Sequence, residues 1–343
     1  MAGEAGSAPR RRPQPMSTPP RAAFGSKGDG IIGGFRALRS FVVFVFTGLW
    51  RWLWKVGMRA CTKQGELERL LSAAPHSPAM TLAFASALRA SRRLADARAR
   101  VLGADGPFDV EREAHAIIAA KAMSAERATF HTLLLPNLTL CLRQLNGAAH
   151  VCGVVARERA TAFNEHSPEH MDLLRALWTS MGVGGGEAAA FERVSRAWTE
   201  IGFQNADPVS DLRGYGVLGL RNLAFFAREY AAEAARIVRE CDLPYKGMPF
   251  AITGINMSAF VGELYEHRLL DWQCFSMYDD PAGPSDDDAL RAFHTTYGHL
   301  LVLLAQAYRD ADPPTIMAFP AVFSEFKDRV RAAAAAGALP DRL

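Results

Sequence analysis

The stretch that most constrains the fold runs from residue 198 to residue 223 and reads WTEIGFQNADPVSDLRGYGVLGLRNL. An apolar pattern with helical spacing ends at Trp198 and resumes near Val217. Between them stand residues that interrupt regular helix, namely Gly202, Pro208, Gly214 and Gly216. The stretch therefore predicts two helices joined by an irregular loop.

This loop carries four polar or charged side chains, those of Gln204, Asp207, Asp211 and Arg213. Arg213 precedes Gly214, and a neighbour without a Cβ atom lets another molecule approach the backbone beside a permanently charged guanidinium. Such a loop is able to present a cation to a phosphate. The alternative is that Asp207 and Asp211 hold Arg213 in a structural ion pair, and chemistry alone favours this alternative.

Three glycines of the stretch also match a nucleotide-binding pattern. Gly214, Gly216 and Gly219 have the GxGxxG spacing of a dinucleotide-binding turn. That motif needs a β-strand directly before it and an acidic residue about 20 positions after it. Residues 207–211 read DPVSD, which is a turn or helix-cap sequence, so we reject a dinucleotide site.

The stretch resembles the signature of the ELMO domain, in particular that of the short ELMO-domain-containing proteins. The family pattern is W-x3-G-F-Q-x3-P-x-T-D-F-R-G-x-G-x-L-G-L-x2-L. Its matching positions here are Trp198, Gly202, Phe203, Gln204, Pro208, Asp211, Arg213, Gly214, Gly216, Leu218, Gly219, Leu220 and Leu223. Two positions depart mildly, Ser210 where threonine is usual and Leu212 where phenylalanine is usual.

Other segments are similar to further parts of the same family. They read WRWLWKVGMRACTKQGELERLL at 50–71, HMDLLRALW at 170–178, AITGINM at 251–257, HTTYGHLL at 294–301 and IMAFPAVFSEF at 316–326. The resemblance thus covers residues 45–335 and is strongest in 165–330.

The resemblance implies a function in GTP hydrolysis. Proteins of this kind activate small GTPases of the Arf and Arf-like group, and the arginine at the position of Arg213 is essential. We therefore expect a GTPase-activating protein that is not itself a hydrolase, uses no cofactor, and acts in trans on a GTPase in its GTP form. The alternative is a non-catalytic ELMO-type scaffold or GTPase effector in small-GTPase signalling and membrane traffic. The longer scaffolds carry armadillo-like and pleckstrin-homology regions, for which this chain has no room or visible pattern.

Two sets of residues accompany Arg213 in this interpretation. The first set supports the loop or binds the partner and consists of Gln204, Asp207, Asp211, Gly214 and Gly216. The second set is structural and consists of Trp198, Phe203 and Pro208. For Gln204 we favour a buried amide that satisfies the loop backbone over a contact with the GTPase. We expect Asp211 to orient Arg213.

Helical periodicity extends over most of the chain, and strand alternation is scarce, so we predict an all-α, compact multi-helix domain. Apolar stripes occur at 171–181, 257–265 and 290–308. Glycine and proline predict breaks at 75–78, 103–107, 136, 182–186, 243–249 and 281–284. We divide the chain into a disordered basic tail at 1–40, a helical region packed on the domain at 41–160, the ELMO domain at 161–330 and an Ala-rich tail at 331–343.

The N-terminal region is basic. Between Asp29 and Glu66 there is no acid, and the basic residues flank aromatic and apolar ones. Residues 36–63 therefore indicate contact with an anionic membrane surface through a helix at 41–58, and a first helix packed on the domain is the equal alternative. The uncharged run at 40–50 is too short for a transmembrane helix. We expect a cytoplasmic protein, peripheral on an endomembrane, with mitochondrial targeting as an alternative.

Composition limits other functions. The formal net charge is +3, and no basic and aromatic interleaving indicates nucleic-acid binding. Five cysteines without a CxxC motif fit reduced thiols better than a disulfide framework. Pro168 lies between His166 and His170, which denies them a helical ligand pair, so we expect no metal site.

Overall fold

The computed structural model describes residues Leu53, Gly57, 64–103, 108–185, 190–241 and 247–339. By its contacts the chain divides into two units, residues 1–63 and residues 64–343, and helices α2 to α14 belong to the second. The described residues form helices and turns without a β-strand, which confirms the predicted all-α class. Apart from Leu53 and Gly57, the predicted basic tail and membrane-surface segment lie outside the described residues.

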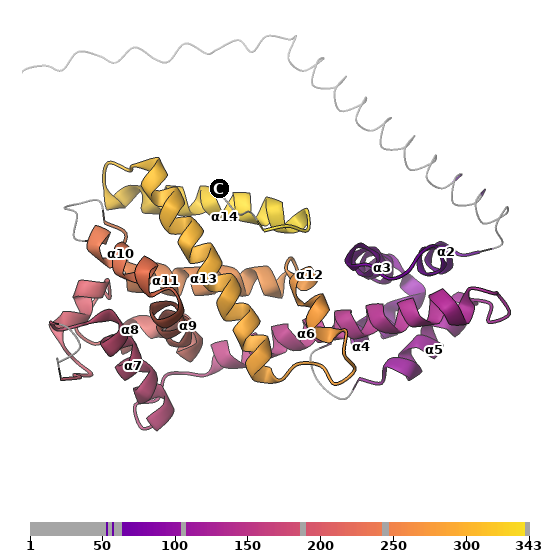
Figure 1. The fold of residues 1–343 in the computed structure, drawn as a ribbon, viewed down its shortest axis with the longest axis horizontal. Helices are drawn as coiled ribbons and strands as arrows, with labels where there is room; N and C mark the ends of the chain where they lie inside the picture. Colours follow the sequence, from indigo (N-terminus) through magenta and orange to yellow (C-terminus); the bar gives the residue numbers. More distant parts are fainter. Residues whose placement is uncertain are drawn as a thin grey trace, which may run out of the picture. The chain divides into compact units, whose positions relative to one another are not determined.

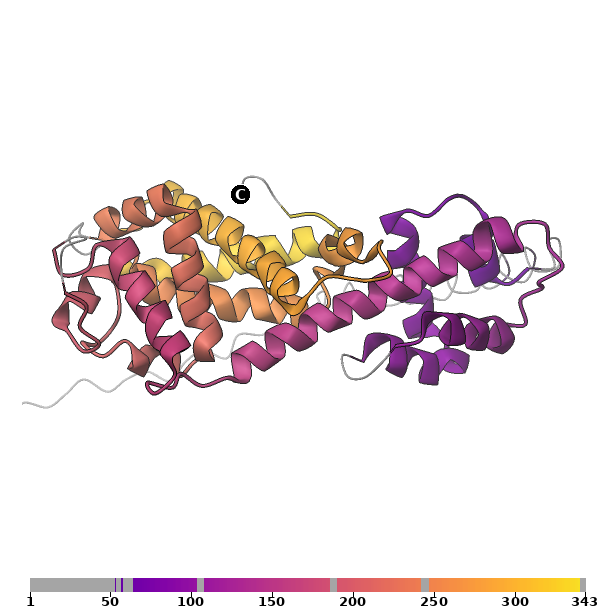
Figure 2. The same cartoon turned by 60° about the horizontal axis from the view of Figure 1, so that its bottom comes forward.

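The second unit is built on α6 (Leu135–Ala160), the long helix that crosses it in Figure 2. Four helices pack around its first half: α2 (Glu66–Ser72), α3 (Pro78–Ala90), α4 (Ala95–Leu102) and α5 (Val110–Lys121). Their apolar faces meet in a common core that includes Leu71, Phe84, Leu88, Ile117 and Leu138. A short 3₁₀ helix, η1 (Arg92–Leu94), joins α3 to α4.

The start of α6 differs from the expectation. A one-turn π-helix, η2 (Phe130–Leu134), runs directly into α6, so the predicted break at Pro136 is wrong. Pro136 stands in the first turn of α6, where a helix has no use for the backbone N–H that proline lacks. Proline at this position is compatible with continuous helix.

The second half of α6 packs against a larger group of helices, shown from red to yellow in Figure 1. They are α7 (Pro168–Met181), α8 (Val209–Leu212), α9 (Gly216–Glu229), α10 (Ala231–Cys241), α11 (Phe250–Glu266), α12 (Asp271–Cys274), α13 (Asp286–Ala311) and α14 (Phe319–Ala335). Short 3₁₀ helices lie between them, η3 (Arg196–Ile201), η4 (Phe275–Tyr278) and η5 (Ile316–Ala318). The three predicted apolar stripes lie in α7, α11 and α13.

Two of the predicted boundaries lie at or inside a helix. The boundary between residues 160 and 161 is the end of α6, whose second half packs against α9 and α13, so both regions share this helix. The predicted boundary at residue 331 falls inside α14, where Val330 and Ala334 are both buried. The first part of the Ala-rich segment is therefore core-facing helix.

None of the helices in the described ranges combines the length and the apolar character that crossing a membrane requires.

Candidate functional site

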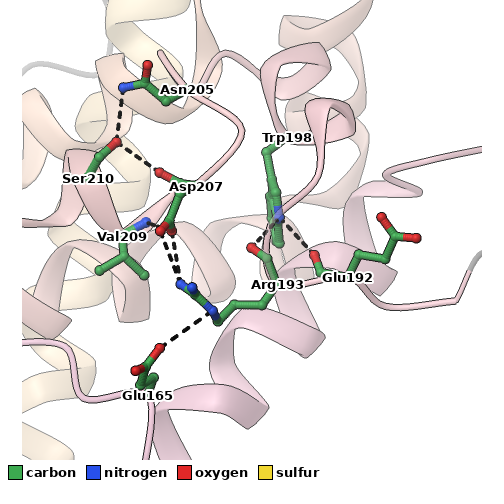
Figure 3. Close-up of polar contacts among 8 residues, drawn as sticks. All are labelled: Glu165, Glu192, Arg193, Trp198, Asn205, Asp207, Val209 and Ser210. Carbon is green, nitrogen blue, oxygen red and sulfur yellow. Dashed lines mark hydrogen bonds and ion pairs between the residues drawn. The ribbon is translucent and has the colours of Figure 1, made fainter.

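The predicted loop begins on a buried aromatic cluster. Trp198 in η3 is fully buried, with its ring 5.0 Å from that of Trp178 and 5.6 Å from that of Phe203. Its indole N–H donates to the carbonyl oxygens of Glu192 and Arg193, at 3.1 and 3.2 Å (Figure 3). Trp198 therefore ties the segment before η3 to the core, and Phe203 does the same for the segment after it.

Gly202 lets the loop pass close to the start of α11. Its φ of +89° lies in the left-handed region, and a Cβ atom there would stand 2.7 Å from the backbone nitrogen of Phe250. The carbonyl oxygen of Gly202 accepts the N–H of Ile252 at 3.3 Å. A side chain at this position would push the loop away from α11.

Asp207 organises the next turn with both its side chain and its backbone. Its carboxylate accepts the N–H of Val209 at 3.1 Å, and its carbonyl oxygen accepts the Ser210 hydroxyl at 2.8 Å (Figure 3). The turn leads into α8, a single helical turn that the sequence did not predict. Pro208, buried, stands at the start of this turn. The segment before this turn is held by the Ser195 N–H, which donates to the Ala206 carbonyl oxygen at 2.9 Å.

Arg213 follows α8 directly and its side chain is exposed. Its Nε–H donates to the carbonyl oxygen of Ser210 at 3.0 Å. Among the described residues it has no ion-pair partner, so the predicted pair with Asp207 or Asp211 is wrong. Asp207 instead pairs with Arg193 at 3.1 Å.

The expected roles of Asp211 and Gln204 also need correction. The Asp211 carboxylate accepts the backbone N–H of Gln204 at 2.8 Å, so it fixes the loop backbone and does not orient Arg213. Gln204 is exposed, which excludes the buried amide that we favoured. With the other described residues, the Gln204 side chain makes no hydrogen bond, and its amide is available to a partner.

The two glycines that follow Arg213 have different surroundings. Gly216, with a φ of +58°, packs on the end of α6, where a Cβ atom would stand 2.4 Å from the Arg159 carbonyl oxygen. Gly214 is exposed, and the nearest atom to a Cβ there is the Asp211 carbonyl oxygen at 3.9 Å. The fold therefore requires glycine at 216 and does not require it at 214.

Tyr215 stands between these glycines, and we did not single it out from the sequence. It is buried, its hydroxyl points against Gly262 of α11, and the Arg159 guanidinium lies 5.2 Å from its ring centroid. Burial raises the pKa of Tyr215 to about 12, so the phenol stays protonated at neutral pH. Tyr215 fixes the backbone behind Arg213 and is not a candidate acid or base.

Arg193 is the other residue that the sequence did not indicate. Its guanidinium contacts Asp207 and lies 3.7 Å from the Glu165 carboxylate, in the connection between α6 and α7 (Figure 3). No local sequence pattern predicts this contact, because Arg193 and Asp207 are 14 positions apart in an irregular segment.

The arrangement presents one exposed guanidinium on a loop that is braced from several sides. Within the part of the chain that the structure describes, no cluster of His, Cys, Asp or Glu side chains is arranged to hold a metal ion. What the loop offers chemically is a fixed cation with unused hydrogen-bond donors, a group suited to an anionic ligand.

Comparison with known proteins shows what this chain is similar to. The sequence model of the ELMO/CED-12 family matches residues 153–323, a range that contains the whole loop. ELMO domain-containing protein B of Dictyostelium discoideum is 28% identical over 223 residues, which cover 65% of this chain and 74% of that protein. ELMO domain-containing protein 2 of Homo sapiens is 29% identical over 194 residues, 57% of this chain and 63% of that protein. ELMO domain-containing protein 1 of Bos taurus is 28% identical over 302 residues, 82% of this chain and 87% of that protein.

Proposed function

We propose, because this chain belongs to the ELMO/CED-12 family, that it is a GTPase-activating protein for Arf or Arf-like small GTPases. Arg213 would enter the nucleotide site of the GTPase in its GTP form and act there as an arginine finger. The partner would carry out the hydrolysis, and this chain would supply the cation.

The exposed guanidinium of Arg213 is the observation that carries this proposal. GTP hydrolysis develops negative charge on phosphate oxygens, and an arginine supplied in trans contributes about 10³ to 10⁵ in rate. This corresponds to roughly 4–7 kcal/mol of transition-state stabilisation. The Nε–H is bonded to the Ser210 carbonyl oxygen, and the two terminal nitrogens make no hydrogen bond to any other described residue.

Gly214 supports the same proposal from a different direction. The chain itself leaves space for a side chain at this position, so glycine here leaves the backbone beside Arg213 open. The proposed GTPase would be able to approach this open backbone closely.

The test is single-turnover GTP hydrolysis by a panel of purified Arf and Arf-like GTPases, with this protein, with Arg213→Ala and with Arg331→Ala. Arg331 pairs with Glu263 in the contact between α14 and α11 and serves as a control for the loss of one partly exposed arginine. Stimulation that is lost in Arg213→Ala and kept in Arg331→Ala supports the proposal. Binding of the GTP form without stimulation contradicts it and supports the scaffold or effector function.

We extend the proposal to a location at an anionic membrane surface, reached through residues 36–63. The sequence supports this with six basic residues and no acid between Asp29 and Glu66: Arg36, Arg39, Arg51, Lys55, Arg59 and Lys63. Co-sedimentation with vesicles that contain phosphatidylserine tests it. Binding that falls when these six residues are changed to glutamine supports the extension, and equal binding to uncharged phosphatidylcholine vesicles contradicts it.

A further inference from the structure

We infer that Arg193 is a positioning residue for Arg213, an inference that rests on the proposed function of the Arg213 loop. A chain of direct contacts connects the two arginines through Asp207 and Ser210, and Figure 3 shows its first part. Arg193 does not reach the partner in this scheme. It fixes the backbone that in turn fixes the guanidinium of Arg213.

The chain of contacts starts at a fixed point. The carbonyl oxygen of Arg193 accepts the indole N–H of Trp198, whose side chain is fully buried. The backbone of Arg193 is therefore held to the core, although its own side chain runs along the surface. From this position the side chain reaches the loop.

The Arg193 side chain contacts two other segments of the chain. One terminal nitrogen lies 3.1 and 3.2 Å from the two carboxylate oxygens of Asp207, and Nε lies 3.7 Å from the Glu165 carboxylate. The same Asp207 oxygen that accepts from Arg193 also accepts the Val209 N–H. The ion pair thus holds the carboxylate in the orientation that closes the turn into α8.

The turn then determines where Arg213 lies. The Asp207 carbonyl oxygen accepts both the N–H and the hydroxyl of Ser210, at 3.2 and 2.8 Å. The Ser210 carbonyl oxygen accepts the Nε–H of Arg213 at 3.0 Å. A change in the orientation of Asp207 is therefore passed to the guanidinium through a single intervening residue.

The exposure of the pair separates a positioning role from a role in stability. The side chains of Arg193 and Asp207 are 31% and 40% exposed, and ion pairs that are this open to water contribute little to global stability. The pair of Arg331 with Glu263 has nearly the same exposure, 35% and 38%, and lies in the contact between α14 and α11. Arg331→Ala is therefore the matched control for Arg193→Ala.

The experiment measures the rate of GTP hydrolysis at saturating activator, the activator concentration that gives half of that rate, and the thermal midpoint. For Arg193→Ala we expect a maximal stimulated rate that is lower by about 10-fold to 100-fold, since small displacements of a reacting group have effects of this size. The thermal midpoint and the half-saturating concentration are expected to stay close to those of the wild type. Arg193→Lys keeps the charge and is expected to restore part of the rate, and Arg331→Ala is expected to leave it unchanged.

A second readout does not depend on the GTPase. The Nε–H signal of Arg213 in ¹⁵N NMR spectra, identified by its loss in Arg213→Lys, reports the bond to Ser210. We expect its exchange with water to become faster in Arg193→Ala and to be unaffected in Arg331→Ala. An unchanged signal, or an unchanged maximal rate in Arg193→Ala, overturns the inference. If the wild-type protein stimulates no GTPase, the proposed function fails, and the signal still decides whether Arg193 positions Arg213.

Discussion

Arg213 donates its Nε–H to the carbonyl oxygen of Ser210 at 3.0 Å, and this bond restrains the guanidinium without occupying its terminal nitrogens. An unrestrained arginine on a surface loop would lose side-chain entropy when it enters a binding site. Part of that loss has already occurred here in the free protein. The relationship between these two residues therefore suits a group that has to act at a defined position in a partner.

The first prediction concerns the shape of the cation. Arg213→Lys keeps the charge but replaces a planar fork, which is able to bridge two phosphate oxygens, with a single ammonium group. Lysine also lacks an Nε–H for Ser210. We expect normal folding by circular dichroism and a stimulated single-turnover rate that is lower by about 100-fold or more. Near-complete stimulation of GTP hydrolysis by Arg213→Lys would contradict the arginine-finger role.

The second prediction concerns the open glycine. Gly214→Ala introduces a methyl group with no close neighbour within the chain, so the free energy of unfolding should change by less than about 1 kcal/mol. The methyl group would stand next to Arg213, on the backbone that the proposed partner would approach. We expect the half-saturating activator concentration for GTP hydrolysis to rise, and an unchanged value would show that no partner comes close to this backbone.

The third prediction concerns the glycine two positions later. Gly216→Ala places a Cβ atom 2.4 Å from the Arg159 carbonyl oxygen and 2.6 Å from that of Thr161, at a φ of +58°. Backbone at the end of α6 has to move, and we expect a loss of about 3 kcal/mol in the free energy of unfolding. Urea denaturation measures this loss. A variant as stable as Gly214→Ala would show that the contact with α6 is not as close as described.

Helices with an apolar stripe were predictable from the sequence, because burial of one face repeats every three to four residues. The stripes in α7, α11 and α13 are of this kind. Short helices carry too few residues for such a pattern. The single turns η2 and α8 were therefore missed. Because η2 was missed, the break predicted at Pro136 was wrong.

The residues of the loop were predictable, and their partners were not. Glycine and proline mark an irregular segment by their backbone preferences, which are local properties. The ion-pair partner of Asp207 depends on which arginine the fold brings close to it. That arginine is Arg193 and not Arg213, although Arg213 is nearer in the sequence. Asp211 bonds to a backbone N–H, a partner that every residue offers and no sequence pattern singles out.

The last prediction concerns a polar network that ties together α9, α11 and α13. The Asn222 amide donates to Ser258 at 2.8 Å, and its carbonyl oxygen lies 2.6 Å from Nδ1 of His294, which therefore donates. Asn222 and Ser258 are fully buried. Burial, followed by the nearby charges of Arg221, Arg228 and Arg291, lowers the pKa of His294 to about 4. The histidine is neutral in the folded protein at neutral pH.

The sign of the pH dependence follows from this lowered pKa. In the unfolded chain His294 binds a proton near pH 6.5, and in the folded protein only near pH 4, so the unfolded state binds more protons between these values. The stabilisation from the neutral histidine is complete above pH 6.5 and is lost as the pH falls toward 4, by up to about 3 kcal/mol.

Glu169, Asp286 and Asp288 have lowered pKa values, so their contributions are lost only below their ordinary range. Urea denaturation between pH 6.5 and 4.5 covers the range in which His294 titrates. Burial also lowers the pKa of His76 and raises that of Asp271, so the contribution of His294 is the difference between the wild type and a His294 variant. We expect a shallower decrease in His294→Gln, which keeps an N–H donor without titrating, and the wild-type decrease in His267→Gln, a change at an exposed histidine. Equal slopes in the wild type and in His294→Gln would show that His294 is not held neutral by its surroundings.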